Sequence, residues 1–210
     1  MTNTVEAPSR RAIVSWCLYD WANSSYNTII TTFVFSVYFA RGVVGDEVAG
    51  ASKWRAALTI AGLAIALLSP VLGAIADRTG RRKPWMALFT VLTVLFSAAL
   101  WWVKPDPSYA LFALVCVVIG TTAFELANVF YNASLTGLAP PAMLGRLSGW
   151  GWGVGYFGGL VCLVVALFVF VKSPAPLFGL LDTADQAPVR ATALLAAAWY
   201  ALFALPFFLW

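Results

Sequence analysis

Six long apolar segments occupy most of the chain, and they restrict its fold more than any other feature. About 20 mainly apolar residues suffice to cross a lipid bilayer as an α-helix. The polar loops between the segments are too short to form a soluble domain. The sequence therefore predicts an all-α polytopic membrane protein whose six-helix transmembrane bundle fills residues 15–210, with spans at about 15–39, 54–76, 85–103, 109–135, 147–171 and 190–210.

The composition supports a lipid environment. Hydrophobic residues make up 61% of the chain and charged residues only 10%, with a mean hydropathy of +0.84. A soluble domain carries about 25% charged residues. The net charge of +4 arises from basic residues in short loops, which is a topological use of charge. We therefore expect the lipid bilayer, and no nucleic acid, as a partner.

Few residue types remain for catalysis or metal binding. The chain has no histidine, and Cys17, Cys116 and Cys162 lie singly in apolar segments. We interpret these cysteines as small hydrophobic residues without a disulfide or metal role. The sequence also lacks a Ser-Lys or paired-Asp protease pattern, so an intramembrane enzyme is a distant alternative. We expect no cofactor, no metal site and no enzymatic activity.

The N-terminal segment, residues 1–14, is expected to lie in the cytoplasm. Arg10 and Arg11 resemble a twin-arginine export signal, but the following run is long, contains polar residues and lacks a cleavage site. Basic residues divide almost equally between the two sides. The dense cluster at residues 78–83 favours the cytoplasm, and no organelle address is present, so we expect a prokaryotic plasma (inner) membrane.

Two of the apolar segments carry nearly the same polar pattern. The sequences are YDWANSSYN at 19–27 and FELANVFYN at 124–132. At 100° per residue, the acid and both asparagines of each segment fall on one helical face, with a tyrosine on its flank. These residues form our candidate substrate and ion pathway: Asp20, Asn23, Tyr26, Asn27, Glu125, Asn128, Tyr131 and Asn132.

Lipid cannot satisfy such a face, because a carboxylate at the bilayer centre costs about 2.5 to 3.5 kcal/mol. One alternative is that the amides simply bond neighbouring helices to each other. Two acids and four amides on matched faces favour a water-filled cavity instead. We also expect both acids in the cytoplasmic half of the membrane. An inverted repeat would place equivalent residues at opposite depths, so the match between the segments is interpreted as convergent or accidental.

The loop after the second segment contains the most specific motif. GAIADRTGRRKP, at 73–84, resembles the G-x-x-x-D-R-x-G-R-R/K signature of the major facilitator superfamily. A glycine permits close packing or a tight turn, and an acid at a helix end can pair with arginines. The alternative is an ordinary positively charged loop. The candidate gating residues are Gly73, Asp77, Arg78, Gly80, Arg81 and Arg82.

Two longer stretches resemble one branch of this superfamily. LYDWANSSYNTIITTFVFSVYF, at 18–39, and YNASLTGLAPPAMLGRLSGWGWGVGYFGG, at 131–159, are similar to the vacuole-effluxer-like branch of vacuolar amino-acid exporters and prokaryotic permeases. The resemblance implies a fold of twelve helices in two halves, with the first and fourth helices lining a central cavity. Because the sequence is still apolar at Trp210, we expect an N-terminal half whose C-terminal half is absent, or a second copy in its place.

Glycines recur every four residues in the fifth segment. Gly151, Gly155 and Gly159 form a small-xxx-small face that lets helices approach closely. The superfamily's antiporter signature has a proline where this chain has Tyr156, so we predict helix packing and do not predict antiport.

These features predict a secondary active transporter, a permease that moves a small polar solute by alternating access. The resemblance implies an amino acid as solute. Asp20 or Glu125 is the candidate carrier of a coupled proton. The alternative is a truncated six-helix membrane protein without transport activity, either a remnant or an interaction partner.

Overall fold

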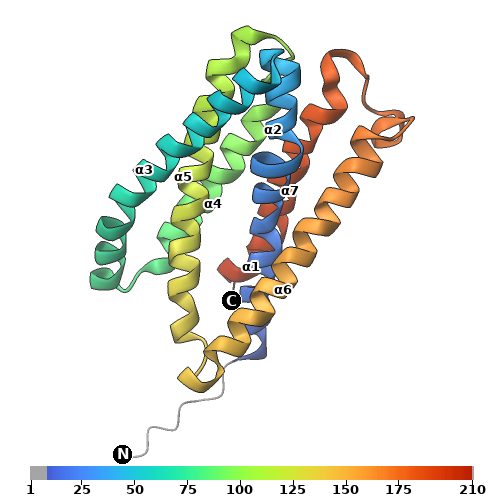
Figure 1. The fold of residues 1–210 in the computed structure, drawn as a ribbon. Helices are drawn as coiled ribbons and strands as arrows, with labels where there is room; N and C mark the ends of the chain where they lie inside the picture. The colour runs from blue at the N-terminus through green and yellow to red at the C-terminus, as the bar shows by residue number, and fades with distance from the viewer. Residues whose placement is uncertain (1–8, 210) are drawn as a thin grey trace, which may run out of the picture.

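The computed structural model describes residues 9–209, except for the side chains of Ala76, Asp77 and Thr79. Within this range, six helices are long and apolar enough to cross a membrane, which confirms the predicted fold class. They form an antiparallel bundle (Figure 1). The six spans are Arg10–Val44, Glu47–Ile75, Arg82–Trp102, Pro107–Gly137, Pro141–Val171 and Ala184–Leu209.

The first span changes helix type along its length. It consists of α1 (Arg10–Ser25), the π-helical η1 (Tyr26–Phe33), the short α2 (Phe35–Tyr38) and the π-helical η2 (Phe39–Val44). A π-helix has i→i+5 bonding and is usually found as single turns at functional sites. The first span is therefore wider than an α-helix in its two π-helical stretches, η1 and η2.

The connection between the first two spans is shorter than the loop expected at 41–53. Gly45 ends the first span with a φ of +75°, a left-handed conformation that glycine adopts without strain. The Asp46 side chain then accepts a hydrogen bond from the Ala49 amide at 2.9 Å. This N-cap starts the next helix at Glu47, so polar residues that resemble a loop belong to the helix.

The remaining spans are mainly α-helical, with short 3-10 turns at several ends. The long helices are α3 (Glu47–Thr79), α4 (Arg82–Ala99), α5 (Ala110–Ser134), α6 (Pro141–Val165) and α7 (Ala187–Leu209). The short elements are η3 (Leu100–Trp102), η4 (Pro107–Tyr109), η5 (Leu135–Gly137), η6 (Ala166–Val171, π-helical), η7 (Pro176–Gly179) and η8 (Ala184–Gln186).

Helix α1 lies inside the bundle, packed against α6 and α7, while α5 packs against α3 and α4. Figure 1 shows α3 and α6 on the two sides of the bundle. The apolar face of α3 is largely uncovered, with Leu63 and Leu67 62% and 75% exposed. An apolar surface of this kind within a span faces lipid or another protein.

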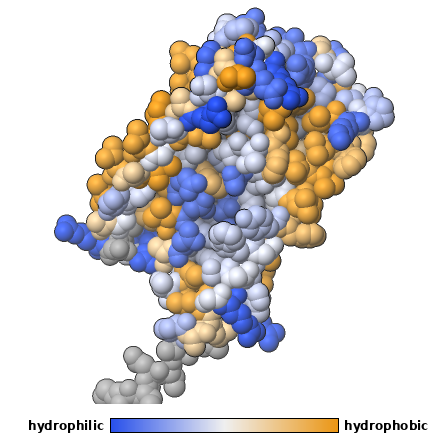
Figure 2. Space-filling model, viewed as in Figure 1, coloured by the Kyte–Doolittle hydropathy of each residue, from blue (hydrophilic) through white to orange (hydrophobic). Residues whose placement is uncertain are grey.

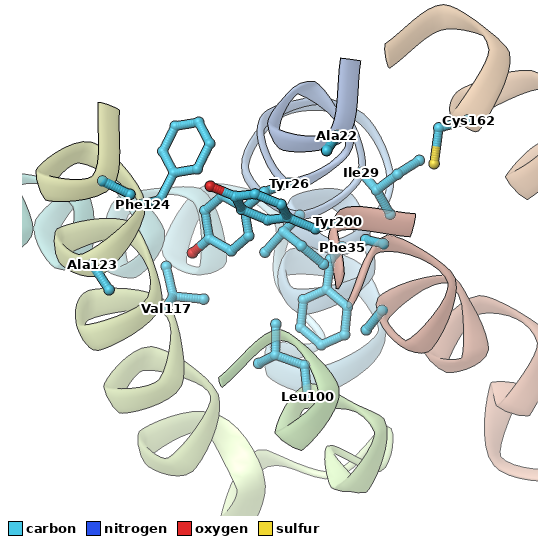
Figure 3. Packing of buried hydrophobic residues seen from close by; sticks show 14 of the residues in the cluster. Ala22, Tyr26, Ile29, Phe35, Leu100, Val117, Ala123, Phe124, Cys162 and Tyr200 are labelled. Carbon is cyan, nitrogen blue, oxygen red and sulfur yellow. The ribbon is translucent and has the colours of Figure 1, made fainter. Parts of the chain in front are cut away.

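The core is rich in aromatic residues from several helices. Figure 3 shows Tyr26, Phe124 and Tyr200 converging between α1, α5 and α7. The buried Tyr19 hydroxyl lies 2.6 Å from Thr90 Oγ1 and 3.0 Å from the Tyr200 hydroxyl. Because buried tyrosines need a partner for their hydroxyls, these bonds hold α1, α4 and α7 together.

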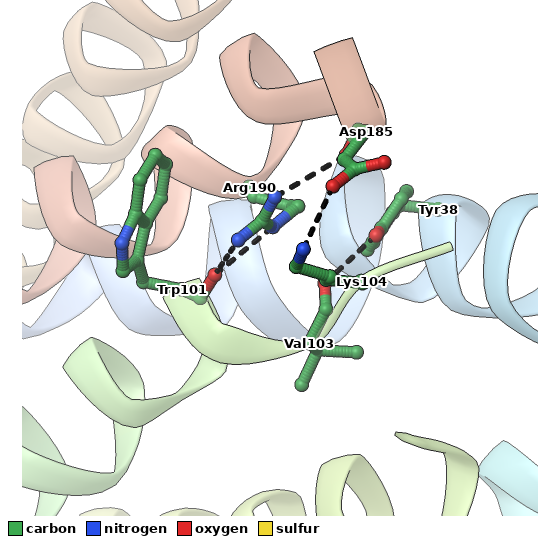
Figure 4. Close-up of polar contacts among 6 residues, drawn as sticks. All are labelled: Tyr38, Trp101, Val103, Lys104, Asp185 and Arg190. Atoms are coloured by element: carbon green, nitrogen blue, oxygen red, sulfur yellow. Dashed lines mark hydrogen bonds and ion pairs between the residues drawn. The ribbon is translucent and has the colours of Figure 1, made fainter. Parts of the chain in front are cut away.

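A cluster of polar residues, the Arg190 clasp, joins the end of η3 to the start of α7 (Figure 4). Arg190 Nε and Nη2 donate to the Trp101 carbonyl at 2.9 and 2.7 Å, and its guanidinium lies 4.7 Å from the Trp101 ring centroid. Lys104 Nζ lies 3.0 Å from Asp185 Oδ2. The clasp satisfies a carbonyl that a helix end leaves without an intrahelical partner.

Candidate functional site

A polar cavity of ≈ 330 Å³ lies between α1, α5 and α6. In Figure 2, hydrophilic residues gather in the middle of the visible face and are flanked by hydrophobic ones. The cavity is lined by Trp16, Asp20, Asn23, Ser24, Asn27, Thr28, Phe124, Glu125, Asn128, Tyr131, Asn132, Ser148, Trp152 and Tyr156. Both polar stripes identified in the sequence therefore line the same cavity.

The two stripes meet at a pair of asparagines. Asn23 Nδ2 of α1 donates to Asn128 Oδ1 of α5 at 2.9 Å and to Asp20 Oδ1 at 3.4 Å. This is the kind of hydrogen bond that the alternative interpretation predicts, in which the amides bond neighbouring helices to each other. The other stripe residues remain exposed or half-buried in the cavity, including Asn27 and Asn132. One hydrogen bond therefore does not account for the whole polar face.

The carboxylates differ in their surroundings. Asp20 is half-buried and receives the long bond from Asn23. Glu125 is exposed to the cavity, and it has neither a hydrogen bond nor an ion pair with any residue in the described part of the chain. The Glu125 side chain thus lies open to the cavity.

The two tyrosines of the motif point to different places. Tyr131 lines the cavity and stacks on Trp16 and Tyr19, with ring centroids 4.4 and 5.2 Å apart. Tyr26 was expected beside the cavity but is buried in the core, where its hydroxyl lies 3.0 Å from Thr121 Oγ1. Tyr26 packs between helices because it lies on the edge of the stripe, where α1 meets α5.

The two acids lie at different heights in the bundle. Each acid lies three residues before its asparagine, and α1 and α5 run antiparallel through the Asn23–Asn128 contact. Asp20 and Glu125 therefore lie on opposite sides of that contact, about 9 Å apart along the bundle at 1.5 Å per residue. That both acids lie in the cytoplasmic half of the membrane stays a prediction.

The glycines of α6 bring the third wall of the cavity close to α1. A Cβ atom at Gly155 would lie 2.6 Å from Asp20 Oδ2, and one at Gly159 would lie 2.6 Å from Thr28 Oγ1. A Cβ atom at Gly151 would meet the Trp16 ring. The absence of side chains at these positions allows α6 to pack against the polar stripe itself.

Several cavity residues were not identified from the sequence. Trp16 and Ser24 lie four residues before and after Asp20, so helical periodicity could have found them. Trp152 and Tyr156 each follow a packing glycine, and only the position of α6 reveals their role. The missed residues are Trp16, Ser24, Thr28, Phe124, Ser148, Trp152 and Tyr156.

The candidate gating loop forms the tight turn between α3 and α4. Gly80 ends α3 with a φ of +64°, and Arg82 Nη1 donates to the Ala133 carbonyl at 2.8 Å. The expected close packing at Gly73 is not seen, because no atom lies within 4 Å of a Cβ built there and α3 is uncovered at that point. Arg78 and Arg81 are exposed, and the side chain of Asp77 lies outside the described residues.

Six membrane-length helices with a polar cavity between them define a polytopic membrane protein. The family described as the Major Facilitator Superfamily matches residues 5–162, which is most of the chain. The chain therefore belongs to the major facilitator superfamily.

Relatives of known sequence support this assignment. The chain is 30% identical over 201 residues to the "Uncharacterized MFS-type transporter YxiO" of Bacillus subtilis (strain 168), covering 91% of this chain and 44% of the relative. It is 26% identical over 151 residues to an "Uncharacterized protein" of Aquifex aeolicus (strain VF5), covering 72% and 37%. The chain thus spans less than half the length of these relatives.

Solved structures show a similar fold. The partially occluded inward-open xylose transporter XylE from E. coli has a TM-score of 0.70 at 17% identity, over 96% of this chain and 50% of that chain. The proton:xylose symporter XylE bound to a bromodeoxyglucose has a TM-score of 0.71 at 17% identity, over 95% and 44%. The six-helix bundle corresponds to about half of such a transporter.

Proposed function

We propose that this chain is the N-terminal half of a secondary active transporter that moves a small polar solute across a membrane by alternating access. The observation that carries the proposal is the shared cavity of the two polar stripes. Acids and amides in a membrane span are expensive unless they serve a solute or ion pathway. Membership of a transporter superfamily favours this function over a six-helix remnant without transport activity.

Amino acids are the solute class suggested by the resemblance to the vacuole-effluxer-like branch. The four amides of the stripes, Asn23, Asn27, Asn128 and Asn132, offer both donors and acceptors to a polar solute. Their side chains come from two antiparallel helices and can contact opposite sides of one molecule.

Transport is proposed to be coupled to protons through Asp20 or Glu125. These are the acids among the described cavity-lining residues, and the chain has no histidine to relay a proton. A carboxylate that is neutral in one orientation of the transporter and charged in the other would link solute movement to the pH gradient. The relative named as a proton:xylose symporter has a similar fold.

The outer faces of the bundle and its orientation are also part of the proposed transporter. The exposed apolar faces of α3 and α6 would contact lipid and a second six-helix half, or a second copy of this chain. The turn from Gly80 to Arg82 would stabilise one orientation, since it ties α4 to the end of α5. We place the N-terminus in the cytoplasm of a prokaryote with the protein in its plasma membrane.

Flux measurements in proteoliposomes would test this proposal. The full-length natural protein should accumulate a radiolabelled solute from an amino-acid panel when a pH gradient is imposed. Asp20→Asn or Glu125→Gln should abolish accumulation while leaving protein yield and folding intact. Accumulation that ignores the pH gradient and survives both substitutions would refute the proton role, and absence of flux for every solute would refute transport.

A further inference from the structure

The charged residues among the described lining of the cavity are all acidic. Its lining includes two carboxylates and several aromatic rings, and none of its described lining residues is Lys or Arg. Such a surface attracts cations and repels anions. Amides alone would suffice for a neutral solute, so the acids and rings together indicate a ligand with a positive charge.

The environment of Asp20 indicates where such a charge would lie. Asp20 Oδ2 and the Tyr131 hydroxyl both abut α6, at 2.6 Å and 3.2 Å from Cβ atoms built at Gly155 and Gly151, respectively. Those glycines are one helical turn apart, about 6 Å. Tyr131 is 3% exposed, and its hydroxyl has no hydrogen-bond partner within the described structure. Both oxygens therefore lie against the same stretch of α6.

Aromatic rings also line the cavity near this stretch of α6. Trp16 stacks on Tyr131, and Trp152 and Tyr156 of α6 lie with ring centroids 5.5 Å apart. Trp152 and Tyr156 are 63% and 71% exposed, although both line the cavity. Their faces are thus free to contact a ligand. Indole and phenol faces attract ammonium groups, most strongly when water is excluded.

We propose that the transported solute carries a protonated or quaternary amine, which pairs with Asp20 beside the exposed rings of Trp152 and Tyr156. This inference rests on the proposed function and specifies its substrate class. An ammonium group fits because the carboxylate supplies the counter-charge, the rings supply cation–π contacts, and the Tyr131 oxygen can accept an N–H bond. Glu125 lies on the other side of the Asn23–Asn128 pair and remains available for a proton.

Matched ligand pairs test this inference without identifying the natural solute. The probes are choline with its uncharged isostere 3,3-dimethyl-1-butanol, and butylammonium with 1-butanol. Binding to the full-length protein in nanodiscs would be followed by tryptophan fluorescence. At least one cation should bind about tenfold or more tightly than its isostere, a factor that one favourable ionic contact supplies. Equal affinity within both pairs overturns the inference.

Two variants assign the effect to Asp20. Asp20→Asn should reduce the preference for the cation to less than about twofold. The control is Asp106→Asn, at an exposed acid outside the membrane, where hydrogen bonds from Ser108 lower the pKa and keep the carboxylate charged at neutral pH. The control should keep the full preference. A preference that survives Asp20→Asn overturns the assignment.

Where Asp20→Asn does not yield folded protein, Trp152→Leu provides the second test. Trp152 is largely exposed, so its loss removes a ring from the ligand position with little loss of packing. The affinity for the cation should fall at least threefold, while the affinity for the isostere stays the same. An equal fall for both ligands overturns the role of the ring.

Flux assays separate this inference from the proposed function. Uptake of the radiolabelled cation, but not of xylose as an uncharged comparison, supports both. Uptake of xylose with no preference for either cation shows that the protein is a transporter and overturns the amine. Cation-selective binding without flux of any solute supports the amine site and overturns transport.

Discussion

At the scale of single residues, asparagines on the same polar face of the first span lie in two different environments. Asn23 is buried and bonded to Asn128, whereas Asn27 is exposed and accepts a hydrogen bond from Thr31 of its own helix at 2.7 Å. Asn23 is thus bonded between two helices, whereas Asn27 presents an exposed amide to the cavity. The two residues lie four positions apart on the same face, so the sequence alone could not distinguish them.

We expect Asn23→Ala to lower the free energy of unfolding by about 0.6 to 1.7 kcal/mol, the range measured for hydrogen bonds between membrane helices. Asn27→Ala should change it by less than about 0.5 kcal/mol, as exposed sites usually do, yet reduce solute flux. SDS-induced unfolding and proteoliposome flux measure the two effects. Equal losses of stability in both variants would contradict the distinction.

The glycines of α6 provide a second pair of variants. A methyl group at Gly151 would meet the stacked Trp16 ring, so Gly151→Ala should destabilise the protein by about 1 to 3 kcal/mol through overpacking. At Gly153 no atom lies within 4 Å of the new carbon. Gly153→Ala should therefore be neutral or stabilise by up to about 1 kcal/mol, because alanine favours the helix. Thermal unfolding in mild detergent compares the two directly.

At the scale of elements, much of the architecture could be predicted from the sequence. The spans follow from apolar length, because lipid requires every backbone polar group to be bonded within a helix. The stripes follow from a fixed 100° per residue. The π-helical turns from Tyr26 to Phe33 could not be predicted, since no local composition marks them. That α6 forms one wall of the cavity could not be predicted either, because it depends on how helices far apart in the sequence pack together.

The Arg190 clasp is the connection between elements that is most open to a test. Arg190→Met should destabilise the protein by about 1.5 to 3 kcal/mol, the loss expected for a hydrogen bond to a charged donor, because the Trp101 carbonyl loses both of its Arg190 bonds. Lys104→Met removes a salt bridge whose partners are about half exposed, so its effect should stay below about 1 kcal/mol. SDS-induced unfolding of the two variants ranks them, and the reverse order would refute the role of the clasp.

At the scale of the whole molecule, one polar cavity lies among the helices, and the flanks of the bundle are apolar. Exposed side chains cover its two sides, such as Leu63 and Leu67 on α3, and Phe157 on α6 and Phe168 on η6. A soluble protein would bury them. The distribution requires a solvent of lipid around the flanks of the bundle.

The orientation in the membrane can be tested with single cysteines in a variant that lacks Cys17, Cys116 and Cys162. Asp106 and Ala142 are exposed beyond opposite ends of α5. With the N-terminus in the cytoplasm, a membrane-impermeant maleimide should label Asp106→Cys in intact cells. It should label Ala142→Cys only after lysis. The opposite pattern would invert the proposed topology.

The π-helical turns in the first span have a consequence for rotation about its own axis. Each wide turn holds more residues than an α turn, and this sets the angular phase between Asp20 at one end and the stretch from Phe35 to Val44 at the other. Tightening η1 by one residue would turn one end by about 100° relative to the other. Conversion of such a turn to α-helix would therefore change which side chains of the first span face the cavity.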